Sequence, residues 1–383
     1  MREIIFLLAL ASANSGVALR VIEPMLPQLA SEFGASVSAT AVIITAYALA
    51  YGAAQLVHGP LGDRFGKLRM VTLTLFGAAA GSFGCAFAQD VSSLAAMRLL
   101  TGLFASTPVI LGMAYIGDRV PIAERQPVIA RFIMGTITGQ ALGPVIGGAV
   151  TDLLGWRGTF ALIGAVFMIV ATVLVVRTHS QWGEDAGAKF QGNPFATHLR
   201  LLGVPRVRAV LSVGLIETFF FFGAFSFLGA YFNVRFGVSL TLAGVLLAGF
   251  GIGGLLYTLM VRKLLMEFGQ RGLVLRGGIA CCVFFTLTAL VPAWPAMMAC
   301  TIGLGFSFYM LHNTLQTKAT EMAPQARGTA VAMYSSAWAL GQAIGTAVMG
   351  LAVGLVDYAP AIIAFGAGYL VLGLWMRGNL NKL

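Results

Sequence analysis

Charged side chains are scarce in this sequence of 383 residues: Asp, Glu, Lys and Arg together make up 10% of it, whereas hydrophobic residues make up 58%. A soluble domain needs many more charges on its surface, so this composition excludes one and indicates an integral membrane protein. The apolar residues form continuous runs without alternation, which excludes a transmembrane β-barrel. At roughly 20 residues per span, the chain has room for about twelve transmembrane helices, an all-α membrane fold.

Motifs of several enzyme and pump classes are missing as well. There is no G-x-x-x-x-G-K-[ST] run to hold nucleotide phosphates, so this chain does not encode ATP-driven pumping, and there is no G-x-S-x-G nucleophile elbow. Only four cysteines occur, all in apolar stretches and without metal-ligand spacing, so we expect them to be small core residues. We expect no enzyme activity, no metal and no cofactor.

The net charge of +10 is distributed unevenly along the chain. Basic residues occur at the N-terminus and in alternate loops between the apolar runs, while the opposite loops contain little beyond Arg157 and Arg235. This asymmetry is the positive-inside pattern, and it predicts a multi-pass protein of a cell (inner) membrane with both termini in the cytoplasm. The charge therefore indicates orientation in a lipid bilayer and not a nucleic-acid partner.

The apolar runs predict two groups of six helices. The longest polar stretch, 177–206, separates them and is expected to be a cytoplasmic linker, part of which could instead form an amphipathic surface helix. It divides the chain into an N-terminal bundle, 1–176, and a C-terminal bundle, 207–383. The first run is too long for a signal peptide and is expected to be an uncleaved helix. The predicted spans are 4–28, 39–58, 70–89, 93–115, 127–150, 158–176, 207–232, 239–261, 273–292, 295–317, 328–351 and 358–376.

The two groups of helices contain matching segments. The run Gly139-Gln140-Ala141-Leu142-Gly143 recurs as Gly341-Gln342-Ala343-Ile344-Gly345, 202 positions later. The pair Phe65-Gly66 recurs as Phe268-Gly269 at an offset of 203, and Arg125 matches Arg327 at 202. Three matches at nearly one offset predict a duplicated six-helix unit.

A charged, glycine-rich run follows the second predicted span: His58-Gly59-Pro60-Leu61-Gly62-Asp63-Arg64-Phe65-Gly66-Lys67-Leu68-Arg69. It resembles the signature of the major facilitator superfamily, G-x-L-a-D-R-x-G-r-k, between transmembrane helices 2 and 3; Lys67 and Leu68 depart from it. We expect Gly59, Gly62 and Gly66 to permit a tight turn and close backbone approach. The resemblance implies two parallel halves around a central cavity, alternating access, and a latch role for Asp63 and Arg64 in the outward-facing state. The alternative is an ordinary basic turn.

A second motif lies in the fifth predicted span, where Gly139, Gly143 and Gly147 recur every four residues. Pro144 and Gly148 complete the motif. The run resembles the motif of the antiporter branch of the superfamily, which mainly exchanges drugs for protons. By this resemblance the span takes part in the conformational switch and the protein is an exporter. The alternative is generic close packing of small residues between membrane helices.

Glu217 is the strongest candidate for a working side chain, because ionisable residues within a membrane are costly. It lies about ten residues into its span and hence roughly 15 Å deep. A carboxyl group there should prefer its neutral form unless a cation lies beside it, which is what exchange of protons for a cationic substrate requires. Phe221 and Phe225 belong to a phenylalanine run that could stack on a flat cation; the alternative, which we favour for most of the run, is that it faces lipid.

Arg20 and Glu23 are three residues apart in the first span and should share a face. Arg98 in the fourth span is expected at similar depth, and Arg98-x-x-x-Gly102 resembles a superfamily motif whose arginine is associated with proton transfer. We therefore predict a cluster in which Glu23 neutralises one or both arginines and is a second proton carrier; a static charge pair is equally compatible. Arg20 would attract anionic groups, so an anionic substrate is an alternative. Polar candidates for substrate binding in the tenth span are His312, Asn313 and Gln316.

Together these features predict a monomeric, proton-coupled transporter of the drug-antiporter type that exports small amphiphilic molecules. One alternative is a transporter of a specific polar metabolite or organic anion, such as a sugar, amino acid or nucleoside. Another, from a different class, is a membrane receptor or enzyme that moves no solute.

Overall fold

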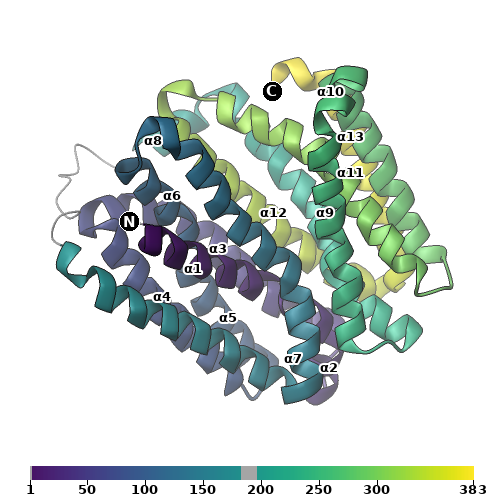
Figure 1. Cartoon of the computed structure of the whole chain (residues 1–383). Coiled ribbons are helices and arrows are strands. Elements are labelled where there is room, and N and C mark those ends of the chain that lie inside the picture. Colours follow the sequence, from purple (N-terminus) through teal and green to yellow (C-terminus); the bar gives the residue numbers. More distant parts are fainter. Residues whose placement is uncertain (1, 183–195) are drawn as a thin grey trace.

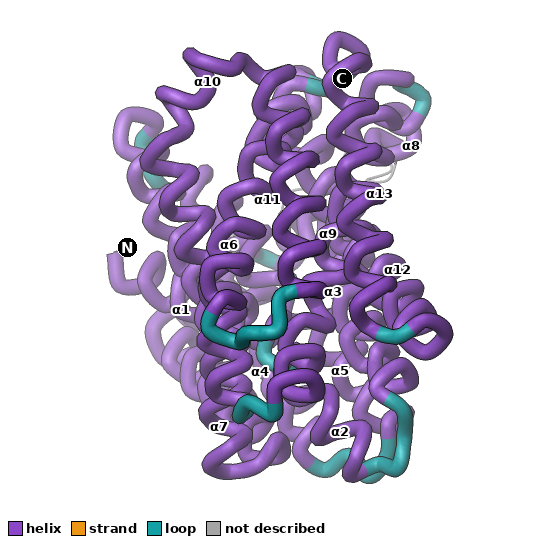
Figure 2. The backbone as a smooth tube through the Cα atoms, turned by 90° about the vertical axis from the view of Figure 1, so that its right-hand side faces the viewer, coloured by secondary structure: helices purple, strands orange, loops and turns teal. Residues whose placement is uncertain are grey.

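The computed structural model describes residues 2–182 and 196–383, and this part of the chain is helical without strands (Figures 1 and 2). Short loops and single turns connect the helices. The α-helices are α1 (Arg2–Arg20), α2 (Leu26–Glu32), α3 (Val37–Phe65), α4 (Lys67–Ala86), α5 (Val91–Ala105), α6 (Thr107–Arg119), α7 (Ile122–Thr178), α8 (Ala196–Leu202), α9 (Pro205–Phe236), α10 (Leu240–Leu290), α11 (Ala296–Glu321), α12 (Arg327–Val356) and α13 (Tyr358–Asn379).

Within the described residues, nine helical stretches are long and apolar enough to cross a membrane. Two of them, α7 and α10, are each two helices joined at a glycine with positive φ, Gly155 (φ 72°) and Gly269 (φ 61°). Counting α7 and α10 as two helices each raises the nine stretches to eleven, and α11 is the twelfth. The described chain therefore contains the twelve predicted segments of span length. The all-α membrane fold expected from the composition is confirmed.

Side-chain caps explain where several helices begin. The Ser36 hydroxyl accepts from the backbone N–H of Ala39 at the start of α3, at 3.0 Å. Asp90 accepts from Ser93 N–H at 2.7 Å and forms a capping box at the start of α5. These side chains satisfy backbone donors that the first turn of a helix leaves without partners.

The first predicted span, 4–28, is wrong as a single helix. α1 ends at Arg20, a short 3-10 turn covers Glu23–Met25, and α2 begins at Leu26. Pro24 lies in the first turn of the 3-10 segment, and the first turn of α2 also contains a proline. A proline has no backbone N–H to continue the preceding helix but fits the first turn of a new one, so the chain restarts twice.

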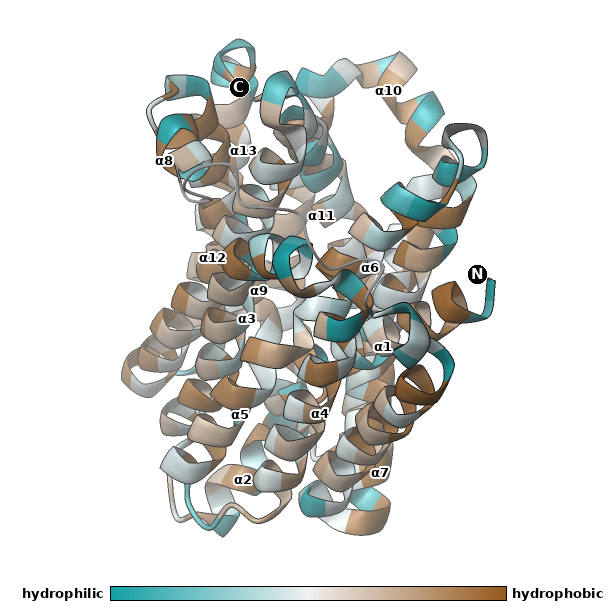
Figure 3. Ribbon diagram, turned by 90° about the vertical axis from the view of Figure 1, so that its left-hand side faces the viewer, coloured by the Kyte–Doolittle hydropathy of each residue, from teal (hydrophilic) through white to brown (hydrophobic). Residues whose placement is uncertain are grey.

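Helices from the two parts of the sequence lie on different sides of the molecule, purple to teal on one side and green to yellow on the other (Figure 1). On the first side α7 packs against α1 and α4, and on the second α10 packs against α11 and α13. The most extensive contacts between the sides are those of α3 with α12 and of α7 with α10, and the 3-10 turn Glu23–Met25 also packs against α9. Hydrophobic residues dominate the flanks, and hydrophilic residues gather toward the end that carries the C-terminus (Figure 3).

The predicted linker, 177–206, contains the short helix α8, which packs against α9 and α12. α7 continues to Thr178 and α9 already begins at Pro205, so the helices extend slightly into the predicted linker. Its residues 183–195 lie outside the described part of the chain. The division into two bundles and a linker stays a prediction.

Candidate functional site

Glu217 and His312 form a buried acid–imidazole pair. Glu217 lies in the middle of α9 with no solvent-accessible surface, and its Oε2 is 3.0 Å from Nδ1 of His312 on α11. The histidine side chain is 12% exposed, whereas the glutamate side chain has no exposed surface, so His312 is the member of the pair that is partly accessible. The other carboxylate oxygen, Oε1, has no hydrogen-bond partner among the described residues. The structure thus brings together two residues that the sequence singled out separately.

The phenylalanine run on α9 packs inside the protein, so the expectation that most of it faces lipid is wrong. Phe221 and Phe225 have no accessible surface and stack at 5.6 Å between centroids. Phe221 also contacts Phe285 and Phe308 of neighbouring helices. In this conformation a ligand reaches Phe221 and Phe225 only if side chains move, so their role in substrate binding stays a prediction.

Arg20 and Glu23 form a second buried pair, with Nε of Arg20 2.8 Å from Oε1 of Glu23. The pair is enclosed by α9: the Arg20 guanidinium lies 4.8 Å from the ring centroid of Phe222 and 4.9 Å from that of Phe225. The Ser226 hydroxyl lies beside the Glu23 carboxylate. The pair therefore joins the end of α1 to the C-terminal helices, although the helix that was predicted to align its two members is broken.

Arg98 lies apart from this pair. Its guanidinium is 3.9 Å from the ring centroid of Tyr47, and it donates to the carbonyl of Ala18 at 2.7 Å. No ion pair between Arg98 and Glu23 is found in the described part of the chain, and Glu23 neutralises only Arg20. Of the predicted three-residue cluster, the structure contains the Arg20–Glu23 pair, without Arg98.

A polar face of α11 leads from the buried pairs outward. Tyr309 lies within electrostatic range of Arg20, and its ring is 6.1 Å from that of His312. Asn313 donates to the Tyr257 hydroxyl at 3.3 Å, and Gln316, one turn further, is exposed. Residues spaced by three and four share a helix face, so Tyr309, His312, Asn313 and Gln316 form one stripe. It runs from the enclosed interior to the exposed end of α11.

The charged motif after the second span is helical for most of its length, which corrects the predicted turn. α3 continues through Gly59 and Gly62 to Phe65, and only Gly66 (φ 90°) breaks it. A Cβ on Gly62 would meet Leu111 at 2.5 Å, so this glycine permits close packing on α6, whereas Gly59 faces open space. Gly66 and the matching Gly269 both have positive φ, so each of the repeated Phe-Gly pairs ends its helical segment.

Lys67 connects the charges of this motif. Its Nζ lies 3.0 Å from Asp63 and 2.7 Å from Asp118 at the end of α6. In the structure the ion-pair partner of Asp63 is therefore this lysine. The Arg64 guanidinium stacks on the neighbouring Phe65 ring at 5.1 Å.

We expect Lys67→Met to slow transport several-fold and to change stability by less than about 1 kcal/mol, because both partner carboxylates are more than half exposed. The substitution leaves two like charges beside each other where α3, α4 and α6 meet. Initial transport rates and the thermal unfolding midpoint are measured together, with Arg69→Met as the matched loss of one charge. A rate equal to that of the wild type contradicts the latch role.

The glycines of α7 divide into two groups. Most of the stripe packs on α1: a Cβ on Gly139 would lie 2.9 Å from Cα of Ala13, and one on Gly143 would lie 3.1 Å from the Val17 carbonyl. Gly147 meets the carbonyl of Val21 in the same way. Gly148 instead touches the backbone of Leu240 at the start of α10. Close packing therefore accounts for the first group, and Gly148 joins the two sides of the molecule.

Polar contacts between the two sides gather at the end of the molecule that carries α2. Asp152 of α7 accepts from the backbone N–H of Thr241 at 2.8 Å and from its hydroxyl at 2.6 Å, which caps α10 from outside. Along α3, Ser38 donates to Gly350 and Thr45 to Ala343, both on α12. The hydrogen bonds of Ser38 and Thr45 lie in the half of α3 nearer to α2, and one more, from Ser336 to Gly52, lies at the middle of α3. In this conformation the two sides are held together at the α2 end.

Removing the Asp152 cap should favour separation at the α2 end. Ser239 remains as the N-cap residue of α10, and the loss is that of the Asp152 hydrogen bonds to Thr241, which costs about 1 kcal/mol, or roughly fivefold in a two-state equilibrium. We expect Asp152→Ala to raise the population with a longer distance between spin labels at Leu153 and Val234, which lie on opposite sides and are exposed. Asp90→Ala is the control, because that cap lies within one side. Equal distance distributions for Asp152→Ala and wild type would contradict the proposed clamp.

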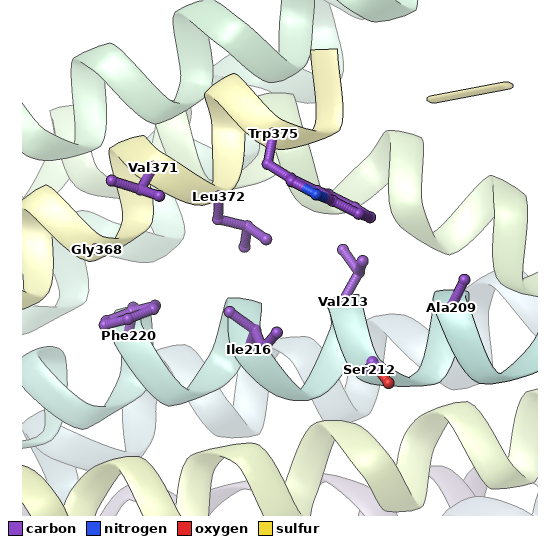
Figure 4. Close-up of a pocket in the computed structure, with 9 residues that line it drawn as sticks. All are labelled: Ala209, Ser212, Val213, Ile216, Phe220, Gly368, Val371, Leu372 and Trp375. Atoms are coloured by element: carbon purple, nitrogen blue, oxygen red, sulfur yellow. The ribbon is translucent and has the colours of Figure 1, made fainter. Parts of the chain in front are cut away.

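A cavity of about 580 Å³ lies between α9 and α13, away from the buried pairs (Figure 4). Figure 4 shows Trp375 at one end of it, opposite Val213. Ile216, Val371 and Trp375 are substantially exposed, and the polar side-chain groups of the lining are the Ser212 hydroxyl and the Trp375 indole N–H. This groove lies on the apolar flank and contains no charged or titratable group, so it does not supply the chemistry of the site.

Comparison with known proteins identifies the fold. The Major Facilitator Superfamily pattern matches residues 8–346 and, in a second overlapping match, 236–380. The chain belongs to the major facilitator superfamily. A superfamily transporter of Bacillus subtilis, the uncharacterized YwfA, is 31% identical over 366 residues, which cover 92% of this chain and 84% of YwfA. The resemblance drawn from the motifs is confirmed.

Other superfamily members match one part of the chain. The riboflavin transporter RibZ of Clostridioides difficile is 31% identical over 153 residues, 39% of this chain and 33% of RibZ. The antiporter QDR3 of Candida albicans is 28% identical over 180 residues, 46% of this chain and 26% of QDR3. Among solved structures, a peptide transporter superposes with a TM-score of 0.77 at 16% identity, covering 99% of this chain and 94% of that one. This likeness shows the shared fold.

Proposed function

We propose that this transporter exports small amphiphilic molecules in exchange for protons. The observation that carries the proposal is the Glu217–His312 pair, a titratable dyad buried at the centre of α9 and α11. Isolated charges at this depth are expensive, so an intramembrane carboxylate with an imidazole partner is a site at which protonation alters conformation or binding. The resemblance of the α7 glycine run to the antiporter motif and the similarity to the antiporter QDR3 support an exchange mechanism.

In the proposed cycle the Glu217 carboxylate attracts a cationic group at the polar face of α11, and proton binding then neutralises Glu217 and releases the substrate. The two sides rock against each other between these steps. We place the α2 end, where the sides are clamped, away from the cytoplasm. Its charge distribution favours a position in the cytoplasmic membrane with both termini inside. Resemblance to the family favours a monomer.

A specific polar metabolite or organic anion is the second candidate. Arg20 was the residue that favoured it, but its charge is neutralised by Glu23, and it lies between Phe222 and Phe225 with 3% exposure. Riboflavin is one candidate metabolite, because RibZ, to which part of this chain is similar, is a riboflavin transporter. The exposed Gln316 and half-buried Asn313 remain the polar groups that a neutral metabolite would meet.

Everted membrane vesicles energised with a proton gradient test the proposal. Uptake of a lipophilic cation, a neutral drug, riboflavin and an organic anion is measured in turn. We expect proton-driven accumulation of the cation, and its collapse when an ionophore removes the gradient. Accumulation of riboflavin or the anion alone would transfer the assignment to a specific metabolite transporter.

A further inference from the structure

Two tyrosines flank Glu217 along α9. A Cβ on Gly214, three residues before Glu217, would lie 2.6 Å from Cε2 of Tyr334, so that ring from α12 packs against α9 one turn before the carboxylate. Tyr369 of α13 packs on Phe221, four residues after Glu217, with ring centroids 5.7 Å apart. Residues 214, 217 and 221 share one helix face. Glu217 therefore lies between the two tyrosine rings.

Both tyrosine hydroxyls are buried polar groups without a hydrogen-bond partner among the described residues, and Glu217 Oε1 is a third. Tyr334 is 4% exposed and Tyr369 has no accessible surface. Each tyrosine also lies within electrostatic range of Glu217. A buried hydroxyl without a partner is costly, and native interiors rarely contain several in one place. Two unpartnered donors beside an unpartnered carboxylate oxygen thus fit a second arrangement in which they meet.

We propose that Tyr334 and Tyr369 are positioning residues that hold the ionised Glu217 carboxylate after it has released its proton. The inference rests on the proposed role of Glu217. When the carboxyl group is protonated it stays with His312 on the more open side. When ionised and without a cationic substrate beside it, it accepts hydrogen bonds from the tyrosine hydroxyls inside the bundle. No covalent bond to carbon changes: the O–H bond of the carboxyl group breaks, its proton passes to the His312 imidazole 3.0 Å away and from there to solvent water, and the two tyrosine O–H groups turn toward the carboxylate.

The groups that face Glu217 come from four helices. They are His312 of α11, Tyr334 of α12, Tyr369 of α13 and the Cys281 thiol of α10. Cys281 is engaged with the Ser307 hydroxyl at 3.0 Å, so its hydrogen-bonding capacity is already used. His312 is the partner in the observed arrangement. The tyrosines are the groups left to receive the carboxylate on the closed side.

Tyr334→Phe and Tyr369→Phe test the inference without knowledge of the substrate. The infrared carbonyl band of the protonated Glu217 carboxyl group, identified by its loss in Glu217→Gln, is followed against pH in the purified protein. Hydrogen-bond donors favour the charged form of a carboxyl group. Removing one hydroxyl should shift the midpoint of the band upward by about one pH unit, the scale of a hydrogen bond to a charged group.

Tyr358→Phe is the matched control, because its hydroxyl is also buried and unpartnered among the described residues but lies beside Asp357 instead of Glu217. It should leave the midpoint unchanged. An unchanged midpoint in both flanking variants, or an equal shift in Tyr358→Phe, overturns the inference. The proposed function fails separately, if Glu217→Gln retains proton-driven transport. The Glu217 band of the wild type and of the tyrosine variants remains measurable in that case, so the two failures are distinguishable.

Discussion

Glu217→Gln should abolish proton-driven accumulation of substrate at every pH while leaving substrate exchange without a gradient intact. Glutamine has nearly the same size as glutamate and retains a hydrogen bond to His312, but it neither binds nor releases a proton. Glu217 is fully buried, so in the variant water does not take over the proton exchange of the missing carboxyl group. Driven accumulation and equilibrium exchange are measured on the same proteoliposomes.

Glu23→Gln is the comparison for this prediction, because Glu23 is the other buried carboxylate among the described residues and is paired with Arg20. We expect Glu23→Gln to weaken the connection between α1 and α9 but to retain proton coupling. If driven accumulation survives in Glu217→Gln and disappears in Glu23→Gln, the proton site lies at the end of α1. Loss in both variants would mean that coupling depends on both pairs.

Gly139→Val should prevent accumulation of folded protein in the membrane. The first side-chain carbon would fall on the Ala13 carbonyl group, where backbone atoms of α1 leave no space. Overpacking of a close interface typically costs 1–3 kcal/mol, and here the neighbour is backbone, which cannot change rotamer. The yield of monodisperse protein after detergent extraction is the measurement.

Gly59→Ala is the matched glycine change, since a Cβ there has no neighbour within 4 Å. Alanine is also the better helix former by about 0.5–1 kcal/mol. Yield and unfolding temperature should therefore equal or exceed those of the wild type. A normal yield of Gly139→Val would show that α1 and α7 are able to separate, and would contradict the packing role of this glycine stripe.

The fold was predictable from the sequence because it depends on features with a short range along the chain. Apolar runs located the spans, but the second and eighth spans were predicted to end at 58 and 261, whereas the helices continue to Gly66 and Gly269. The break after Arg20 was not predicted, because apolar residues continue through it and hide the effect of Pro24. Gly59 and Gly62 were taken for turn residues, but a glycine is compatible with a membrane helix wherever a neighbour packs closely or space is open.

The site was predictable only as a set of residue types. Depth along a helix follows from residue number, so Glu217 was identified as an intramembrane carboxylate. Which face of α9 meets which face of α11 depends on the packing of the whole bundle. The pairing of Glu217 with His312 was therefore not predicted. The same applies to Arg98, which lies against Tyr47 instead of Glu23, and to the phenylalanines, whose contacts come from α10, α11 and α13.

Proton movement triggered by substrate is the most direct test of the central claim, that transport is coupled to protonation. Wild-type protein is reconstituted in liposomes with an imposed pH gradient and an internal pH-sensitive dye, and a lipophilic cation is added. The account predicts an immediate proton flux that is lost in Glu217→Gln. Transport of labelled cation without any proton flux would contradict proton-coupled exchange, whatever the fate of the Glu217 variant.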